Sequence, residues 1–157
     1  MKIISGGQTG ADRAGLDAAR RCRLETGGRA PSRYWTERGP DPSLAQFGLT
    51  AGGTVAERTI ANVAAADATI VFMTGSSPGS DLTIAAARAR TKPLLVIDPW
   101  VSAAADAVAG FLRQHRPLVL NVAGHRESTA PGIYARVVEV LTAALTRFVP
   151  PPSSPTP

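Results

Sequence analysis

Short apolar runs alternate with segments of helical periodicity along most of this chain. The apolar runs that read as strands are 2–5, 68–73, 93–97 and 117–122. The segments predicted as helices are 10–24, 54–65, 80–90, 101–115 and 131–148. Strands that alternate with helices join through right-handed crossovers and form a parallel sheet. We therefore predict an α/β fold, with a doubly wound, mostly parallel sheet that carries helices on both faces, built as one domain over residues 1–149.

Two stretches depart from this alternation. Residues 25–52 are rich in glycine, proline and arginine and show no clear period. A long irregular stretch of this kind is uncommon unless it covers a site or is mobile. Residues 150–157 contain five prolines in eight positions, so we predict a disordered tail there.

Polar, glycine-rich stretches follow the predicted strands. They lie at 5–10, 74–80, 98–99 and 121–128. In open parallel sheets, ligands bind beyond the carboxyl ends of the strands. The sequence therefore predicts a binding site at that edge of the sheet.

The first of these loops has the composition of an anion site. Two glycines end the first strand and a helix starts at once, with Thr9 as a candidate N-cap and Asp12 placed to reach back in a capping box. Glycines let a backbone approach a ligand, and the first-turn amides of a helix attract anions. The alternative is a tight strand-to-helix turn without a ligand. The candidate ligand-binding residues are Gly6, Gly7, Gln8, Thr9, Gly10 and Arg13.

The loop over 74–80 repeats this design, with small residues and hydroxyls leading into a helix that Ser80 can cap. The candidate donors are Gly75, Ser76, Ser77, Gly79, Ser80 and Thr83. A loop of this composition alone is often only a turn. Two such loops side by side suit a ligand with a phosphate at one end and a polar ring at the other.

Further candidates lie on other elements. Arg58 and Asn62 are spaced i, i+4 and share a helix face, which can point to the cleft or to solvent. Asn121 is expected to end the last strand. Arg126 and Ser128 can add anion donors, although Glu127 can neutralise Arg126 instead.

Composition narrows the classes of function. The net charge is +5, and all but two of the 17 basic residues are arginine, whose planar fork suits phosphates and carboxylates. The 5% aromatic content offers few stacking platforms, which disfavours a nucleic acid partner. The chain has no run of 18 apolar residues, no visible secretory signal and one cysteine. We therefore expect a cytoplasmic protein that does not span a membrane.

Several catalytic and cofactor motifs are absent. The chain has no Gly-x-x-x-x-Gly-Lys-Ser/Thr motif, and its first loop differs from Gly-x-Gly-x-x-Gly. No cysteine and histidine cluster has metal-ligand spacing, so no metal site is predicted. His115 and His125 have no evident carboxylate or nucleophile partner in the sequence, and no general acid and base stand out.

Four stretches together resemble the molybdenum cofactor carrier family, a Rossmann-like branch of the superfamily that includes the lysine-decarboxylase-like LOG proteins. They are IISGGQTGADRAGLD from Ile3, ERTIANV from Glu57, KPLLVID from Lys92 and LNVAGHRESTAPGIY from Leu120. The resemblance implies a single Rossmann-like domain, usually a homo-oligomer such as a dimer or tetramer. It also implies a phosphorylated small molecule as ligand, with the molybdenum cofactor as cargo and a molybdoenzyme as acceptor.

The chain departs from the family's pattern in two places. The family's second loop usually reads Ser-Gly-Gly-Thr, whereas Ser77-Pro78-Gly79-Ser80 stands here, and Pro78 lacks a backbone N–H. Residues 31–53 are also unlike the family's Pro- and Tyr-rich stretch. Both departures lie where ligand selectivity is expected to be set.

Similarity to the LOG enzymes offers an alternative, a nucleoside 5'-monophosphate-binding protein or a phosphoribohydrolase. The glutamate that helps LOG enzymes cleave the N-glycosidic bond is replaced here by Thr83 or nearby apolar residues. A hydroxyl cannot supply the charge or the basicity of a carboxylate. We therefore expect binding without turnover, with no catalytic residue.

Overall fold

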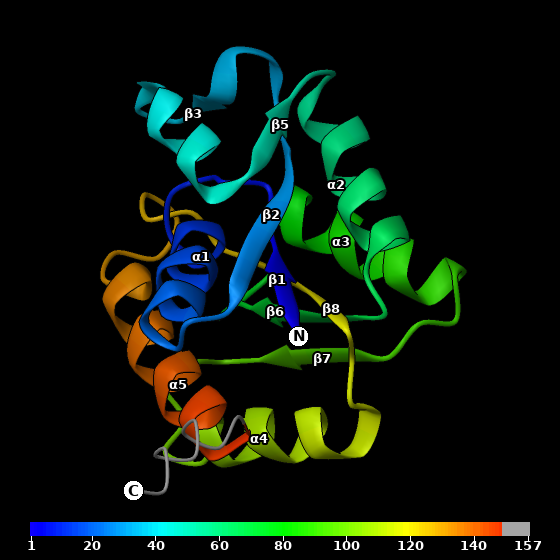
Figure 1. Ribbon diagram of the computed structural model, residues 1–157, viewed down its shortest axis with the longest axis vertical. Helices are drawn as coiled ribbons and strands as arrows, with labels where there is room; N and C mark the ends of the chain where they lie inside the picture. Colours follow the sequence, from blue (N-terminus) through cyan, green and yellow to red (C-terminus); the bar gives the residue numbers. More distant parts are fainter. Residues whose placement is uncertain (149–157) are drawn as a thin grey trace, which may run out of the picture.

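A six-stranded, all-parallel sheet forms the centre of the molecule in the computed structural model, which describes residues 1–148 (Figure 1). The strand order is β5-β2-β1-β8-β6-β7. The strands are β1 (Lys2–Ile4), β2 (Glu25–Ala30), β5 (Leu49–Ala51), β6 (Ala68–Phe72), β7 (Leu94–Ile97) and β8 (Val119–Gly124). The predicted tail over 150–157 lies outside the described residues.

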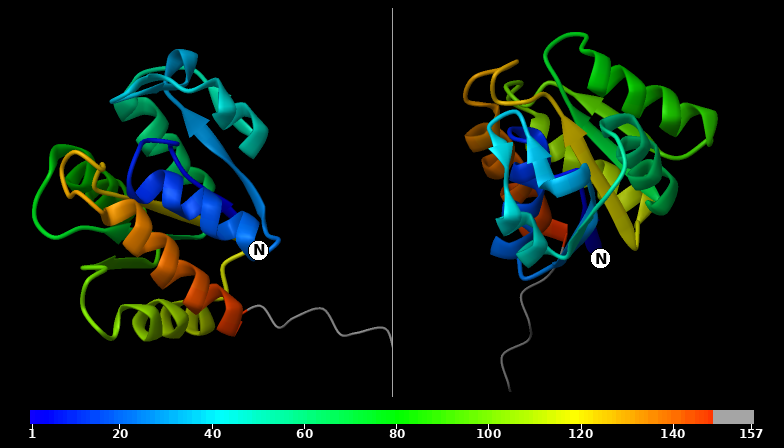
Figure 2. Two further views of the ribbon diagram at one scale, coloured as in Figure 1. Left: turned by 90° about the vertical axis from the view of Figure 1, so that its left-hand side faces the viewer. Right: turned by 90° about the horizontal axis from the view of Figure 1, so that it is seen from above.

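Helices cover both faces of this sheet (Figures 1 and 2). One face carries α1 (Ala11–Arg21), α4 (Ala104–His115) and α5 (Ile133–Phe148), and the other carries α2 (Val55–Ala65) and α3 (Pro78–Ala89). The predicted α/β, Rossmann-like class is therefore confirmed. Among the described residues, no helix is both long and apolar enough to cross a membrane.

The main core lies between the sheet and the first of these helix layers. Ala11, Ala14 and Ala18 of α1 are fully buried there, as is a stripe on α5 formed by Ile133, Val137, Leu141 and Leu145. A second, smaller core joins α1 to the segment between β2 and β5 through Leu16, Leu44, Phe47 and their neighbours. That segment is therefore anchored to the domain.

The stretch over 25–52 is more regular than predicted. It contains β2 and β5, two 3-10 helices (η1, Ser32–Tyr34, and η2, Pro42–Phe47) and a short antiparallel hairpin of β3 (Trp35–Thr36) and β4 (Gly39–Pro40). The sequence Glu-Thr-Gly-Gly-Arg-Ala of β2 has poor strand propensity. Its pairing with β1 and β5 overrides that preference.

The two helix caps that the sequence suggests, Thr9 and Ser80, are wrong. Gly10, not Thr9, precedes α1, and no side chain caps that helix. Ser77 precedes α3, so Ser80 lies inside its first turn. The capping box of Thr54 and Glu57 at the start of α2 is present, and its hydrogen bonds lower the pKa of Glu57.

Asn121 is the third residue of β8 rather than its last, because the strand continues to Gly124.

Close packing of α1 on the sheet gives a prediction. A Cβ at Gly15 would lie 2.8 Å from the Val122 side chain. We expect Gly15→Ala to lower the free energy of unfolding by about 1–3 kcal/mol through overpacking. Urea denaturation measures this change. Gly110→Ala in α4 is the matched control: its nearest contact would be at 3.9 Å, so removing a helical glycine there should stabilise the protein. Equal stabilisation by both substitutions would contradict the expected clash.

Candidate functional site

Two cavities lie beyond the carboxyl ends of the strands, on opposite sides of the first loop. The smaller, of about 270 Å³, reaches from the first loop to the starts of α2 and α3 and to the residues after β8. The larger, of about 500 Å³, lies between the first loop, α1, the β3–β4 hairpin and the start of α5. Both are at the sheet edge that the sequence indicates.

The predicted residues are divided between these cavities. Those that line the smaller cavity are Gln8, Arg58, Ser77, Gly79, Ser80, Thr83, Arg126 and Ser128. Those that line the larger are Gly7, Thr9, Gly10 and Arg13. Neither lining includes Gly6, Asn62, Gly75, Ser76 or Asn121.

The amides of the first loop are bonded to the protein's own acceptors. The N–H of Gly7 donates to Ser5 Oγ at 3.1 Å, that of Gln8 to Asp12 Oδ2 at 3.3 Å, and that of Thr9 to Gln8 Oε1 at 3.1 Å. The first amide of α1, on Ala11, donates to the His125 carbonyl. The expectation that Gly7, Gln8 and Thr9 form an open amide cradle is therefore corrected, because these three amides already have acceptors inside the protein.

The glycines of this loop serve packing. A Cβ at Gly6 would lie 1.4 Å from Arg58 Nη1, and one at Gly10 would lie 2.3 Å from the His125 carbonyl oxygen. Gly7 and Gly10 also have φ values of 73° and 75°. Residues other than glycine adopt such backbone angles only at a cost in free energy. The glycine pattern therefore reflects close approach of protein atoms rather than of a ligand.

A buried ion pair connects the first loop to α2. Arg58 Nη1 lies 3.0 Å from Asp12 Oδ2, and the two side chains are only 11% and 5% exposed. Burial raises the pKa of Asp12, while the Arg58 guanidinium and the amides of Gln8 and Gly6 act in the opposite direction. Arg58 thus lines the cleft rather than pointing to solvent, and its Nη1 atom is bonded to Asp12.

The second loop leads into an open helix N-terminus. Among residues 1–148, the amides of Gly79 and Ser80 in the first turn of α3 have no hydrogen-bond acceptor, as is usual for that position. The Ser77 hydroxyl donates to Ser80 Oγ at 3.0 Å, and the Thr83 hydroxyl donates to the Gly79 carbonyl. Two amides and the Ser80 hydroxyl are therefore available to an anion in the smaller cavity.

Two arginines line the same cavity as this helix end. Arg58 and Arg126 belong to the lining of the smaller cavity, together with Gly79 and Ser80. Positive charge and open N–H groups around one cavity favour a negatively charged ligand. Glu127, which was an alternative partner for Arg126, instead accepts hydrogen bonds from the amides of Gly132 and Tyr134.

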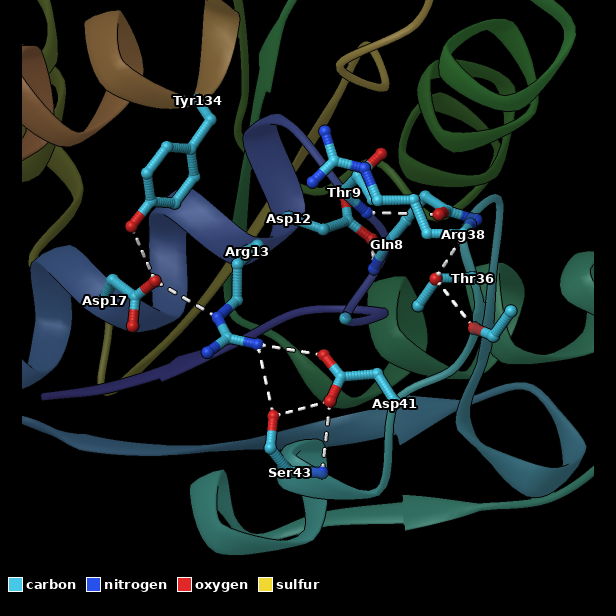
Figure 3. Close-up of polar contacts among 12 residues, drawn as sticks. Gln8, Thr9, Asp12, Arg13, Asp17, Thr36, Arg38, Asp41, Ser43 and Tyr134 are labelled. Carbon is cyan, nitrogen blue, oxygen red and sulfur yellow. Dashed lines mark hydrogen bonds and ion pairs between the residues drawn. The ribbon is translucent and has the colours of Figure 1, made fainter.

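The larger cavity holds charges of both signs. Arg13 donates to Asp17 Oδ2 at 3.1 Å and to Asp41 Oδ2 at 3.0 Å, so its charge is balanced inside the protein. Figure 3 shows Arg13 between these carboxylates. The Tyr134 hydroxyl donates to Asp17, and burial together with that bond raises the pKa of Tyr134. This cavity suits a polar group with several hydrogen-bonding atoms rather than a phosphate.

Some predicted residues have structural roles. The Asn62 side chain accepts from the Arg29 amide at 2.8 Å and donates to the Arg29 carbonyl at 3.0 Å, which ties α2 to β2. Ser76 donates to Asp81. Asn121 is 2% exposed and pairs in register with Ile4 and Thr69 in the middle of the sheet.

Sequence reasoning missed most of the larger cavity. Its unpredicted lining residues are Asp17, Thr36, Arg38, Gly39, Pro40, Asp41, Glu127 and Tyr134. The available signal was the long irregular stretch after the first helix, which does border a cavity. No pattern within that stretch identified which of its side chains point inward.

Comparison with known proteins gives a consistent picture. The model of the circularly permuted YpsA SLOG family matches residues 3–145. A solved structure from Syntrophus aciditrophicus SB, named "Putative molybdenum carrier protein", is similar to this chain with a TM-score of 0.84 and 36% sequence identity. The match covers 92% of this chain and 94% of that one. No curated protein matches the chain.

Proposed function

Because this chain belongs to the circularly permuted YpsA SLOG family, we propose that its cleft binds and carries a phosphorylated small molecule, and that this molecule is the molybdenum cofactor. The observation that carries the proposal is the smaller cavity, which the open amides of Gly79 and Ser80 line together with Arg58 and Arg126. The similar structure named as a molybdenum carrier supports the choice of ligand.

The donor set fits the phosphate and pterin parts of that cofactor. Amides, hydroxyls and arginines bind phosphate, and the mixed polar lining of the larger cavity can hydrogen-bond a pterin ring. Among the described residues, no group of three or more His, Cys, Asp or Glu side chains is arranged to hold a metal ion. The cargo is therefore held through its organic part, and its dithiolene keeps the molybdenum.

The walls of the smaller cavity also favour binding over turnover. By resemblance, Thr83 or the apolar residues near it stand in place of the glutamate of LOG-type enzymes, and the Thr83 hydroxyl donates to the Gly79 carbonyl. Asp12 is the one carboxylate side chain in the described lining, and it is paired with Arg58. We propose that the protein protects its ligand and releases it unchanged to an acceptor enzyme.

Calorimetric titration tests this proposal. We expect heat of binding and a raised melting temperature with molybdopterin, weaker binding of AMP, and none of adenosine, which lacks the phosphate. Absence of heat and of a thermal shift with both phosphorylated compounds would reject the proposal. Release of adenine from AMP would instead favour a phosphoribohydrolase.

A further inference from the structure

The carboxylate of Glu37 sits among donors that are suited to a ligand's anionic group. Its oxygens accept from the Thr9 hydroxyl, from the Ser128 hydroxyl and, at 3.2 Å, from the Ser128 amide. Glu37 lies at the tip of the β3–β4 hairpin, between Thr36 and Gly39. The Glu37 carboxylate thus occupies hydrogen-bond donors of Thr9 and Ser128 that suit an anionic group of a ligand.

This carboxylate is held in its charged form. Burial acts to raise the pKa of Glu37, but the hydrogen bonds from Ser128 and Thr9 and the charge of Arg126 outweigh burial, so its pKa is lowered from 4.5. At neutral pH, Glu37 therefore places a negative charge near Arg126, which lines the same cavity as the first turn of α3.

Glu37 contacts residues that line both cavities. Its partner Thr9 lines the larger cavity, whereas Ser128 lines the smaller. The Glu37 amide also donates to Gln8 Oε1 at 2.9 Å, and Gln8 lines the smaller cavity as well. The hairpin tip therefore bonds to the walls of two spaces that adjoin the same loop.

The β3–β4 hairpin is short. Its ladder consists of the pairs Trp35 with Pro40 and Thr36 with Gly39, and Trp35 is 54% exposed. Arg33 and Tyr34, which precede it, have φ values of 60° and 55°, and Gly39 has a φ of 99°. Left-handed backbone therefore occurs just before β3 and at the start of β4, where the chain changes direction.

We propose that Glu37 is an internal competitor for an anion subsite formed by Thr9, Ser128 and Arg126, and that an anionic group of the ligand displaces it. Displacement lifts the hairpin over 35–40 and joins the two cavities into one cleft. This inference rests on the proposed function, since the ligand that does the displacing is the phosphorylated molecule of the smaller cavity. The hairpin thereby couples loading of the phosphate to access for the rest of the ligand.

Glu37→Gln tests the competitor role, because glutamine keeps the size of the side chain and removes its charge. If the carboxylate closes the subsite about nine-tenths of the time, the variant should bind AMP about tenfold more tightly than the wild type. Glu25→Gln, at the exposed start of β2, is the matched control for the change in net charge. It should leave the affinity for AMP unchanged.

Tryptophan fluorescence reports the movement of the hairpin. The chain has two tryptophans, so Trp100→Phe leaves Trp35 as the reporter. We expect AMP to change the Trp35 emission in this background. Tighter binding by Glu37→Gln together with that change supports the inference. Equal or weaker binding by Glu37→Gln, with the wild type still binding, overturns the inference and leaves the proposed function intact. Failure of both proteins to bind molybdopterin and AMP overturns the proposed function and the inference together.

Discussion

Replacement of Arg58 by alanine is expected to lower the free energy of unfolding by about 3–5 kcal/mol, because it leaves the Asp12 carboxylate buried without its cation. The same change removes the guanidinium that packs against Gly6. For a domain of this size, the loss corresponds to a fall of roughly 10 °C in melting temperature. Urea denaturation and differential scanning calorimetry measure the two quantities.

Two further variants separate the ion pair from a general loss of positive charge. Arg88→Ala, at an exposed position of α3, should change the free energy of unfolding by less than about 0.5 kcal/mol. Asp12→Asn combined with Arg58→Ala should recover part of the lost stability, because no uncompensated charge then stays buried. Equal losses for Arg58→Ala and Arg88→Ala would show that the pair contributes nothing specific.

Placement of a carboxylate in the first turn of α3 is expected to remove phosphate binding while the fold stays intact. A Cβ at Gly79 meets no atom within 4 Å, so Gly79→Asp fits, and an acidic residue there is favourable for the helix. Two unit charges about 4 Å apart repel by roughly 1 kcal/mol in water and about 4 kcal/mol near a protein surface. We therefore expect the affinity for AMP or molybdopterin to fall at least about 30-fold, with no loss in melting temperature.

The matched controls for this substitution are at the same helix end. Gly79→Asn has nearly the same shape without the charge and should retain most of the affinity. Gly75→Asp adds the same charge in the loop before α3, at a position that also has no atom within 4 Å but is outside the cavity linings. If Gly75→Asp weakened binding as much as Gly79→Asp, the phosphate would not be bound at the amides of α3.

The elements that the sequence predicted well are those with strong periodicity. Runs such as Ala68–Phe72 are buried along their whole length and have no other plausible structure. The stripe of α5 likewise faces the core as its spacing requires. In contrast, β2 contains Gly27 and Gly28 and became a strand only through its neighbours. Local propensity cannot reveal a strand whose stability comes from partners far away in the sequence.

The site was predicted in outline, because the carboxyl ends of parallel strands meet at one edge. The role of each residue was less accessible. Gly6 looked like a place for a ligand, yet the atom that approaches it belongs to Arg58, which is 52 positions away in the chain. Glu37 carried no motif at all, since its significance comes from contacts with Thr9 and Ser128 across the fold. Only tertiary structure shows which donors the protein has already used.

The segment that carries Glu37 leaves the sheet at β2 and returns to it at β5, and these two strands are direct neighbours. It leaves after Ala30 and returns at Leu49, which pairs with Gly28, so both of its ends are held in adjacent, hydrogen-bonded strands whatever the tip does. In the displacement that we propose for Glu37, the tip moves while the two strands keep their pairing. We therefore expect substitutions around residue 37 to change the rates of ligand binding and release while the melting temperature stays nearly constant.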